Sequence, residues 1–348
     1  MANEPMHRDL KSELRVILEA ITIEPPLAFT FAGRRIQVDP AAPYSMPQVP
    51  GVQNPLIASL QMQIYQHCYC RRFDGSAVEA PVSSDGGEDL TGDLTQANVG
   101  QERWEPGWQV TQFLSSGELA VQRNGLNRLL WPGDYLTPDG PGGMPHKGSY
   151  VSVFCRKHST SLQPGFYFVF GETLGDQQDE SSPLRFYWHV AAAGITALVG
   201  GLTRELNRFP VPFRFKCLTR SALYARADAA VLFVARRMYP VVAGLVEDTY
   251  HRVAPQLRAD APLFAKPLAP GLALAEDPGN GESFGSHRCR LVAEALVNAE
   301  THGRRTPEAR LEEVEKLFHE HGLSLESPHL SRGSIDCYQW PIPELFLQ

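Results

Sequence analysis

Two cations alternate with apolar residues in the short run FRFKCL, which spans Phe213–Leu218. In a strand, successive side chains point to opposite faces, so Arg214 and Lys216 would share one face. Phenylalanine and cysteine neighbours make a charged ammonium costly at Lys216, and the like charge of Arg214 adds to that cost. Both effects lower the pKa of the lysine toward neutrality, where an amine can act as a general base. The pair is typical of a site that removes a proton beside a bound anion.

Other cations can complete such an anion site. Arg226 and, later in the chain, Arg288 can join Arg214 around a single dianion, with Tyr224 close by. Arginine forms bidentate hydrogen bonds with phosphate and carboxylate oxygens, so phosphate is the natural guest of this set.

The same arginines can instead belong to a structural network of ion pairs. Residues 262–290 carry the acidic pair Glu276 and Asp277 together with Lys266, several prolines and several glycines. This composition gives a constrained backbone, which is typical of a functional loop and equally of a well-packed connection. Both interpretations stay open.

His146 and Lys147 are adjacent at the end of the Gly- and Pro-rich stretch 139–148, just before an alternating apolar run. A histidine and a lysine at a junction between a loop and a strand are typical of a catalytic acid or an anion clamp. They are equally typical of a solvated turn.

Composition excludes several classes of protein. The 348 residues carry a formal net charge of -7, whereas a nucleic-acid-binding protein needs a basic face. The six cysteines show no spacing typical of zinc, so we expect reduced thiols and no metal. No apolar run reaches the roughly 18 residues that a membrane helix needs, and no signal segment opens the chain. We expect a cytoplasmic protein without membrane contacts.

Periodicity and capping residues predict the elements that position these residues. Helices are expected over residues 7–21, 55–70, 191–207 and 239–256, and after the caps Ser283 and Thr306. Strands are expected over residues 29–38, 104–121, 124–136, 149–156, 165–172, 184–190, 211–218 and 229–235. This irregular alternation favours one α+β domain over 1–348, with a mixed or antiparallel sheet flanked by helices. Residues 74–103 are polar and rich in Gly, Ser, Asp and Thr, which predicts a mobile loop within the domain.

Several stretches resemble one protein family. They are GFYFVFGE, LRFYWHV, PFRFKCL, YARADAAVLFVA and LAPGLALAEDPGNGESFGSHRCRLVAEAL, all within residues 154–299. They are similar to the HopA type III effector family, whose relatives include lyase components of class V lanthipeptide and thioamitide biosynthesis. The resemblance implies a phosphoserine/phosphothreonine lyase. A kinase phosphorylates a ribosomal precursor peptide, and the lyase eliminates phosphate to give dehydroalanine or dehydrobutyrine.

The resemblance also implies roles for individual residues, because phosphothreonine lyase effectors use a lysine base, a histidine acid and arginines that hold phosphate. The matching positions are Lys216 as the base, Arg214, Arg226 and Arg288 as phosphate ligands, and Tyr224 as an orienting group. For the acid we prefer His146 to His189, which precedes a helix. Further candidate phosphate or substrate ligands are Lys147, Arg185, Lys266, Glu276, Asp277 and Ser283.

An elimination of this kind needs neither a metal nor an organic cofactor. The sequence contains no kinase signature, so the implied partners are a phosphorylated precursor peptide, a separate Ser/Thr kinase and a candidate cyclase. Two alternatives remain open. One is a non-catalytic subunit that binds the peptide or assists cyclisation, and the other is an effector-like protein that binds a partner protein.

Overall fold

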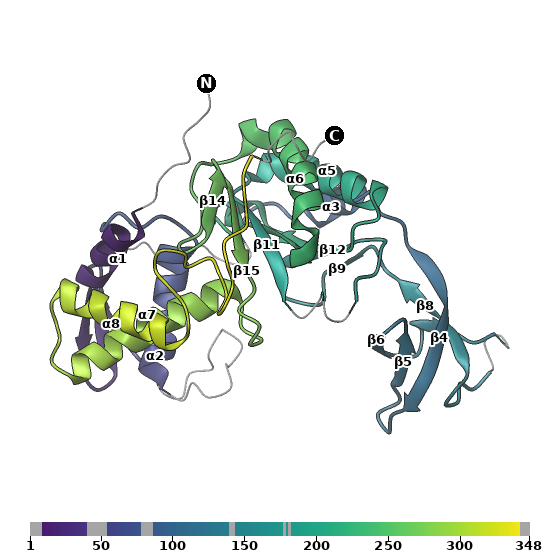
Figure 1. Ribbon diagram of the computed structural model, residues 1–348, viewed down its shortest axis with the longest axis horizontal. Helices are drawn as coiled ribbons and strands as arrows, with labels where there is room; N and C mark the ends of the chain where they lie inside the picture. The colour runs from purple at the N-terminus through teal and green to yellow at the C-terminus, as the bar shows by residue number, and fades with distance from the viewer. Residues whose placement is uncertain are drawn as a thin grey trace.

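A computed structural model describes residues 9–39, 54–77, 86–138, 143–176, 179 and 182–341. Within these residues the chain forms three antiparallel sheets with flanking helices, which confirms the α+β class. Figure 1 shows three parts along the long axis. A helical part lies at one end, a large sheet lies in the middle, and a smaller sheet lies at the other end.

The helical part combines elements of residues 10–69 with elements of residues 284–320. Its elements are α1 (Leu10–Glu19), β1 (Ile21–Glu24), β2 (Ala28–Phe31), β3 (Arg34–Gln37), α2 (Pro55–Ile64), the π-helix η1 (Tyr65–Tyr69), α7 (Phe284–Thr301) and α8 (Pro307–Glu320). The predicted caps are confirmed, because Ser283 and Thr306 accept hydrogen bonds from the backbone N–H groups of Ser286 and Ala309. Apolar faces of these helices meet in one core that includes Leu14, Leu60 and Leu296.

The central sheet has the strand order β14-β15-β11-β13-β12-β10-β9, and each neighbouring pair is antiparallel. Its strands are β9 (His158–Ser159), β10 (Phe166–Phe170), β11 (Pro183–Trp188), β12 (Phe213–Leu218), β13 (Ala230–Ala235), β14 (Lys266–Ala269) and β15 (Leu272–Glu276). The predicted strands over 165–172, 184–190, 211–218 and 229–235 are thereby confirmed.

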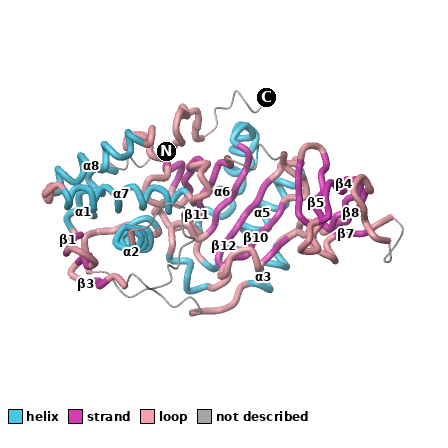
Figure 2. Tube along the Cα trace, turned by 90° about the horizontal axis from the view of Figure 1, so that it is seen from below, coloured by secondary structure: helices cyan, strands magenta, loops and turns pink. Residues whose placement is uncertain are grey.

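The two faces of the central sheet have different neighbours. One face packs on α5 (Ile195–Arg208) and α6 (Tyr239–Val253) through residues such as Phe186, Phe215 and Leu232, as Figure 2 shows. Helix α3 (Thr91–Ala97) packs on α5. Short 3-10 turns connect these elements at η2 (Ala192–Gly194), η3 (Ser221–Ala225), η4 (Arg236–Met238) and η5 (Ala254–Gln256). The side chains that alternate with these along the strands point to the opposite face, and Arg214 and Lys216 are among them.

The smaller sheet has the order β6-β5-β4-β8-β7. Its strands are β4 (Arg103–Phe113), β5 (Leu119–Arg123), β6 (Leu126–Leu130), β7 (Tyr135–Leu136) and β8 (Tyr150–Cys155). Its buried residues form a core of their own around Trp108 and Val153, separate from the other two cores. The strands predicted over 104–136 and 149–156 therefore build a separate sheet.

Two predicted loops contain regular structure. In the stretch 74–103, residues 91–97 form helix α3, whose Leu94 is buried, so that part of the loop prediction is wrong. Residues 78–85 lie outside the described part of the chain. Within 262–290, β14 and β15 form a hairpin that turns at Gly271, where φ is +75° and a Cβ atom would meet the carbonyl oxygen of Arg258. Helix α3 was missed because its residues are mostly polar, and the β14–β15 hairpin was missed because proline and glycine are typical of loops.

Candidate active site

Strand register places the predicted cations side by side on one face of the central sheet. In one cross-strand row, Arg185 of β11 and Arg214 of β12 flank Phe233 of β13. In the next row, Tyr187 and Lys216 flank Val231. The sequence predicted that Arg185 and Tyr187 share one face of their strand, and that Arg214 and Lys216 share one face of theirs. Antiparallel pairing with β13 places these two pairs of residues on the same face of the sheet.

The ring of Phe233 lies at the centre of three cations. The guanidinium carbons of Arg185 and Arg214 lie 5.2 Å and 5.9 Å from its centroid, and the Lys216 nitrogen lies 6.0 Å from it. The same nitrogen lies 4.5 Å from the ring centroid of Phe166. Aromatic faces attract cations, so these rings hold the positive charges close together where water is partly excluded.

We call Arg185, Arg214, Lys216 and Arg226 the cation cluster. Arg185 pairs with Asp277, and Arg226 makes two bonds to Asp228, of 2.8 Å and 2.9 Å. Among the described residues, Arg214 and Lys216 pair with no carboxylate. Half of the cluster is therefore compensated, although the acid at Arg226 is Asp228 and not the predicted Glu276 or Asp277, and the other half lacks such a partner in the described part of the chain.

The pKa of Lys216 is lowered from 10.5 to about 8. Desolvation is the largest cause, the positive charges of Arg185, Arg226 and Arg214 add to it, and Asp228 opposes it. A single hydrogen bond of 3.2 Å, donated to the side-chain oxygen of Gln163, holds the ammonium. A lysine with this pKa exists partly as the neutral amine near pH 8, which is the form that accepts a proton.

Tyr65 joins the site from η1. Its hydroxyl donates to Asp228 at 2.8 Å and accepts from Arg226 at 3.3 Å. Burial raises the pKa of Asp228, but Arg226 and the Tyr65 hydroxyl outweigh this and hold that pKa at about 2. The carboxylate therefore stays charged and fixes Arg226 in place. Tyr65 also stacks on Tyr69 within η1, with ring centroids 5.0 Å apart, and Tyr69 packs edge-on against Tyr187 of β11, with centroids 6.5 Å apart, which holds the π-helix against the sheet.

Sequence reasoning did not find Tyr65, because residues 55–70 read as one packed helix. The available signal was the pair of tyrosines at positions i and i+4, which share a helix face. Asp228, two residues after Arg226, was a second signal.

The structure does not bring His146 and Lys147 to Lys216. Both are exposed residues on the connection that leads into β8, where the His146 ring contacts the backbone oxygen of Lys147. They precede Tyr150 at the start of β8, whereas a pocket between the two sheets is lined by Val153, Phe154 and Cys155, about 10–17 Å further along the strand. The smaller sheet lies at one end of the molecule (Figure 1), and the residues that it places next to β12 are those that line the pocket, such as Arg128 and Phe154, but not His146 or Lys147.

His189 is also held by structural contacts. It is buried at the end of β11, with Nδ1 3.2 Å from the carbonyl oxygen of Asp260. Burial is the main cause that lowers the pKa of His189, so the imidazole is neutral near pH 7.

Tyr224 and Arg288 are buried away from the exposed part of the cation cluster. Tyr224 packs in the core on the α5 side, and its hydroxyl donates to the carbonyl oxygen of Leu218 at 2.6 Å. The Arg288 guanidinium is fully buried and donates to the carbonyl oxygens of Pro328 and Leu330 at 2.9 Å and 2.7 Å. Both residues connect backbone segments in this conformation.

Three further candidates also have structural partners. Lys266 on β14 binds both carboxylate oxygens of Asp336. Glu276 is fully buried and bonds to Arg236 and the Tyr338 hydroxyl. Ser283 caps α7, as predicted. Of the residues predicted from the sequence, the structure thus brings Lys216, Arg214, Arg226 and Arg185 together, with Asp277 as the partner of Arg185.

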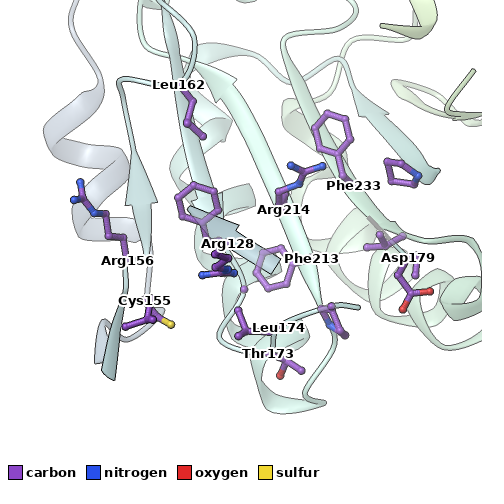
Figure 3. Close-up of a pocket in the computed structure, with 18 of the residues that line it drawn as sticks. Arg128, Cys155, Arg156, Leu162, Thr173, Leu174, Asp179, Phe213, Arg214 and Phe233 are labelled. Atoms are coloured by element: carbon purple, nitrogen blue, oxygen red, sulfur yellow. The ribbon is translucent and has the colours of Figure 1, made fainter. Parts of the chain in front are cut away.

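A pocket of about 450 Å³ opens next to the cluster. Arg214, Phe213 and Phe233 line it from the central sheet, and Arg128 and Phe154 line it from the smaller sheet (Figure 3). This volume lies within the range of small-molecule and peptide side-chain sites. Arg214 belongs to both the cluster and the pocket wall, so a ligand bound at one reaches the other.

The part of the chain that the structure describes has neither a metal-binding cluster nor a membrane-spanning helix. No group of His, Cys, Asp and Glu side chains there could hold a metal ion. None of the helices described there is both long enough and apolar enough to cross a bilayer.

No curated protein matches the chain. Two solved structures are similar to it. The effector protein from Pseudomonas syringae pv. tomato strain DC3000 shares 17% identity over 50% of this chain and 66% of that chain, with a TM-score of 0.40. The effector protein from Pseudomonas syringae pv. syringae strain 61 shares 18% identity over 48% of this chain and 63% of that chain, with a TM-score of 0.36. The chain thus aligns with less than two thirds of either effector.

Residues 157–330 match the HopA1 effector protein family. The matched region spans half of the chain and contains all four residues of the cation cluster, and the chain therefore belongs to the HopA1 effector protein family.

Proposed function

We propose that this protein is a phosphoserine/phosphothreonine lyase that acts on a phosphorylated peptide. The observation that supports the proposal most is Lys216, whose pKa is lowered to about 8 beside an arginine that has no carboxylate partner among the described residues. A base and a phosphate ligand on one strand face are the two parts that such an elimination needs.

The cluster binds the phosphoryl group through Arg214, with Arg185 and Arg226 adding positive potential. A phosphomonoester carries a charge close to -2 at neutral pH, which Arg214 offsets directly and the potential of Arg185 and Arg226 offsets further, while Lys216 is in its neutral form. The bound phosphate places the α-carbon of the phosphorylated residue near the Lys216 amine.

The neutral amine of Lys216 takes the proton from the α-carbon. The electron pair of that C–H bond forms the Cα=Cβ double bond, and the Cβ–O bond breaks with its pair going to the departing phosphate. The proton then passes from the Lys216 ammonium to phosphate or solvent, which restores the amine. The products are dehydroalanine or dehydrobutyrine and inorganic phosphate. We assign no proton-donor role to His146, because its loop lies away from β12 in this conformation.

The phosphate must come from another protein, since the sequence holds no kinase signature. We propose a separate Ser/Thr kinase as the source and a ribosomal precursor peptide of the lanthipeptide type as the substrate. A cyclase that adds thiols to the dehydrated residues is the candidate partner downstream.

Mass spectrometry of phosphoserine and phosphothreonine peptides incubated with the protein tests the proposal. We expect wild type and Lys316→Met, a control at an exposed lysine of α8, to remove the mass of phosphoric acid, and Lys216→Met to leave the peptide unchanged. Phosphopeptide binding without elimination in wild type would favour a non-catalytic peptide-binding subunit. Absence of both would favour an effector-like protein that binds a partner protein.

A further inference from the structure

The pocket between the two larger sheets contains more positive charge than its own acids compensate. Asp134 pairs with Arg156 at 2.6 Å, and Asp179 pairs with Arg237, so these charges are neutralised locally. Among the described residues, Arg128 and Arg214 have no carboxylate partner. Two arginines without carboxylate partners therefore face a common space.

Arg128 is held in place by its own sheet. Its guanidinium carbon lies 5.3 Å from the ring centroid of the buried Trp108, which restricts the side chain before any ligand arrives. Figure 3 shows Arg128 entering the pocket from the smaller sheet and Arg214 entering from the central sheet. A side chain held in this way loses little conformational entropy on binding.

The remaining wall of the pocket is apolar. Phe154, Phe170, Phe213, Phe233 and Leu174 line it. Apolar walls exclude water and strengthen the attraction between a guanidinium and an anion. The pocket is thus suited to a side chain that has a short apolar stem and an anionic end.

We propose that this pocket is a subsite for an acidic side chain of the peptide substrate, with Arg128 as its carboxylate ligand. The inference rests on the proposed function, because it places the phosphoryl group at Arg214 and Lys216. An extended peptide advances about 3.3–3.6 Å per residue, so the acidic residue lies within about two positions of the phosphorylated one. Glutamate fits best, since its longer stem also covers the phenylalanines.

The test uses pairs of phosphoserine peptides. The two peptides of a pair are identical except that one carries Glu and the other Gln at a single position, which is one of the two before or the two after the phosphoserine. Affinities are measured by fluorescence anisotropy on Lys216→Met, in which the peptides stay intact, and elimination is measured on wild type. At one of these positions we expect Glu to bind about tenfold more tightly than Gln, as a hydrogen bond to a charged group provides.

The preference for Glu over Gln should disappear when Arg128→Gln is added. It should shrink but survive with Arg128→Lys, which keeps the charge. The added change Arg204→Gln removes an exposed arginine of α5 and should leave the preference intact. Because the preference is a ratio measured on one preparation, partial loss of folded protein does not change it.

Two results would overturn the subsite. One is equal affinity for Glu and Gln at every position, and the other is a Glu preference that survives Arg128→Gln. Elimination by wild type without a Glu preference would reject the subsite and keep the lyase. A Glu preference that depends on Arg128, without elimination by wild type, would keep the subsite and reject the lyase.

Discussion

At the scale of single residues, Lys216 differs from the other described lysines of this chain in its lowered pKa. Its nitrogen lies over two aromatic rings and pairs with no carboxylate of the described ranges, whereas Lys11, Lys266 and Lys316 each bind at least one carboxylate. Removing water from an ammonium without pairing it favours the neutral form. The chain therefore keeps a charge at Lys216 at an energetic cost, which is typical of functional sites.

This cost predicts the pH dependence of turnover. Because the neutral amine is the base, the rate of elimination should rise about tenfold per pH unit below the pKa of about 8 and level off above it. Rates measured between pH 7 and 9.5 avoid the second ionisation of the phosphomonoester, which lies near pH 6. A rate that is independent of pH over this interval, with chemistry shown to be rate-limiting, would contradict Lys216 as the base.

Two arginines that looked equivalent in the sequence should respond differently to substitution. Arg214 is exposed and has no carboxylate partner in the described part of the chain, so Arg214→Gln should leave the free energy of unfolding within about 0.5 kcal/mol of wild type. It should weaken phosphopeptide binding by tenfold or more, since it removes hydrogen bonds to a charged group.

Arg288→Met should have the opposite effect. It leaves two buried carbonyl oxygens without donors and should cost about 2–4 kcal/mol of stability, while the folded protein binds phosphopeptide normally. Urea denaturation and fluorescence anisotropy measure the two effects. If Arg288→Met weakened phosphopeptide binding and Arg214→Gln did not, the phosphate ligand would be Arg288 and not Arg214.

At the scale of elements, the site depends on the contact of α7 with η1. A Cβ atom on Gly285 would lie 2.5 Å from ring carbons of Tyr69 and 2.8 Å from a ring carbon of Tyr65. Gly285→Ala should displace these rings, reduce turnover through Arg226 and Asp228, and lower stability by about 1–3 kcal/mol despite alanine's higher helix propensity.

Gly92→Ala is the matched control. Gly92 lies in α3 with open space where its Cβ would lie, so the substitution should stabilise the protein slightly and leave turnover unchanged. Thermal melts and elimination rates compare the two variants. If Gly285→Ala had the same melting temperature and elimination rate as Gly92→Ala, the rings of Tyr65 and Tyr69 could move without affecting stability or turnover.

Local patterns predicted most elements, because period-two and helical repeats are properties of neighbouring residues. Alternation in β12 gave the shared face of Arg214 and Lys216, and serine and threonine caps gave the starts of α7 and α8. Such local patterns do not predict the order of strands in a sheet. Arg185 meets Arg214 only because β13 lies between their strands, and that neighbourhood depends on contacts far apart in the sequence.

The placement of His146 shows the same limit. A histidine before a strand is compatible with a catalytic acid, but only the assembled fold shows that its strand belongs to another sheet. Tyr65 was missed for the converse reason, since its sequence pattern is that of an apolar helix, whereas the residue lies in the π-helix η1 and reaches Asp228 through tertiary packing.

At the scale of the whole molecule, the matched family region and the smaller sheet are distinct parts. The family match begins at residue 157, directly after β8, and the smaller sheet has its own core and its own strand pairing. The central sheet carries the cation cluster, while the smaller sheet supplies the other wall of the pocket. We infer that the first part holds the chemistry and the second selects the peptide.

This division predicts that the smaller sheet can be removed. Arg103 and Cys155 are paired residues of β4 and β8, so their Cα atoms lie about 5 Å apart and a short Gly-Ser linker between them can replace residues 104–154 without strain. The shortened chain should unfold cooperatively, eliminate phosphate from saturating peptide, and lose the Glu preference that Arg128 provides. Thermal denaturation and peptide competition measure these outcomes. An unfolded product would show that the 348 residues form one inseparable domain, because the remaining core would then need the β4–β8 sheet to bury its surface.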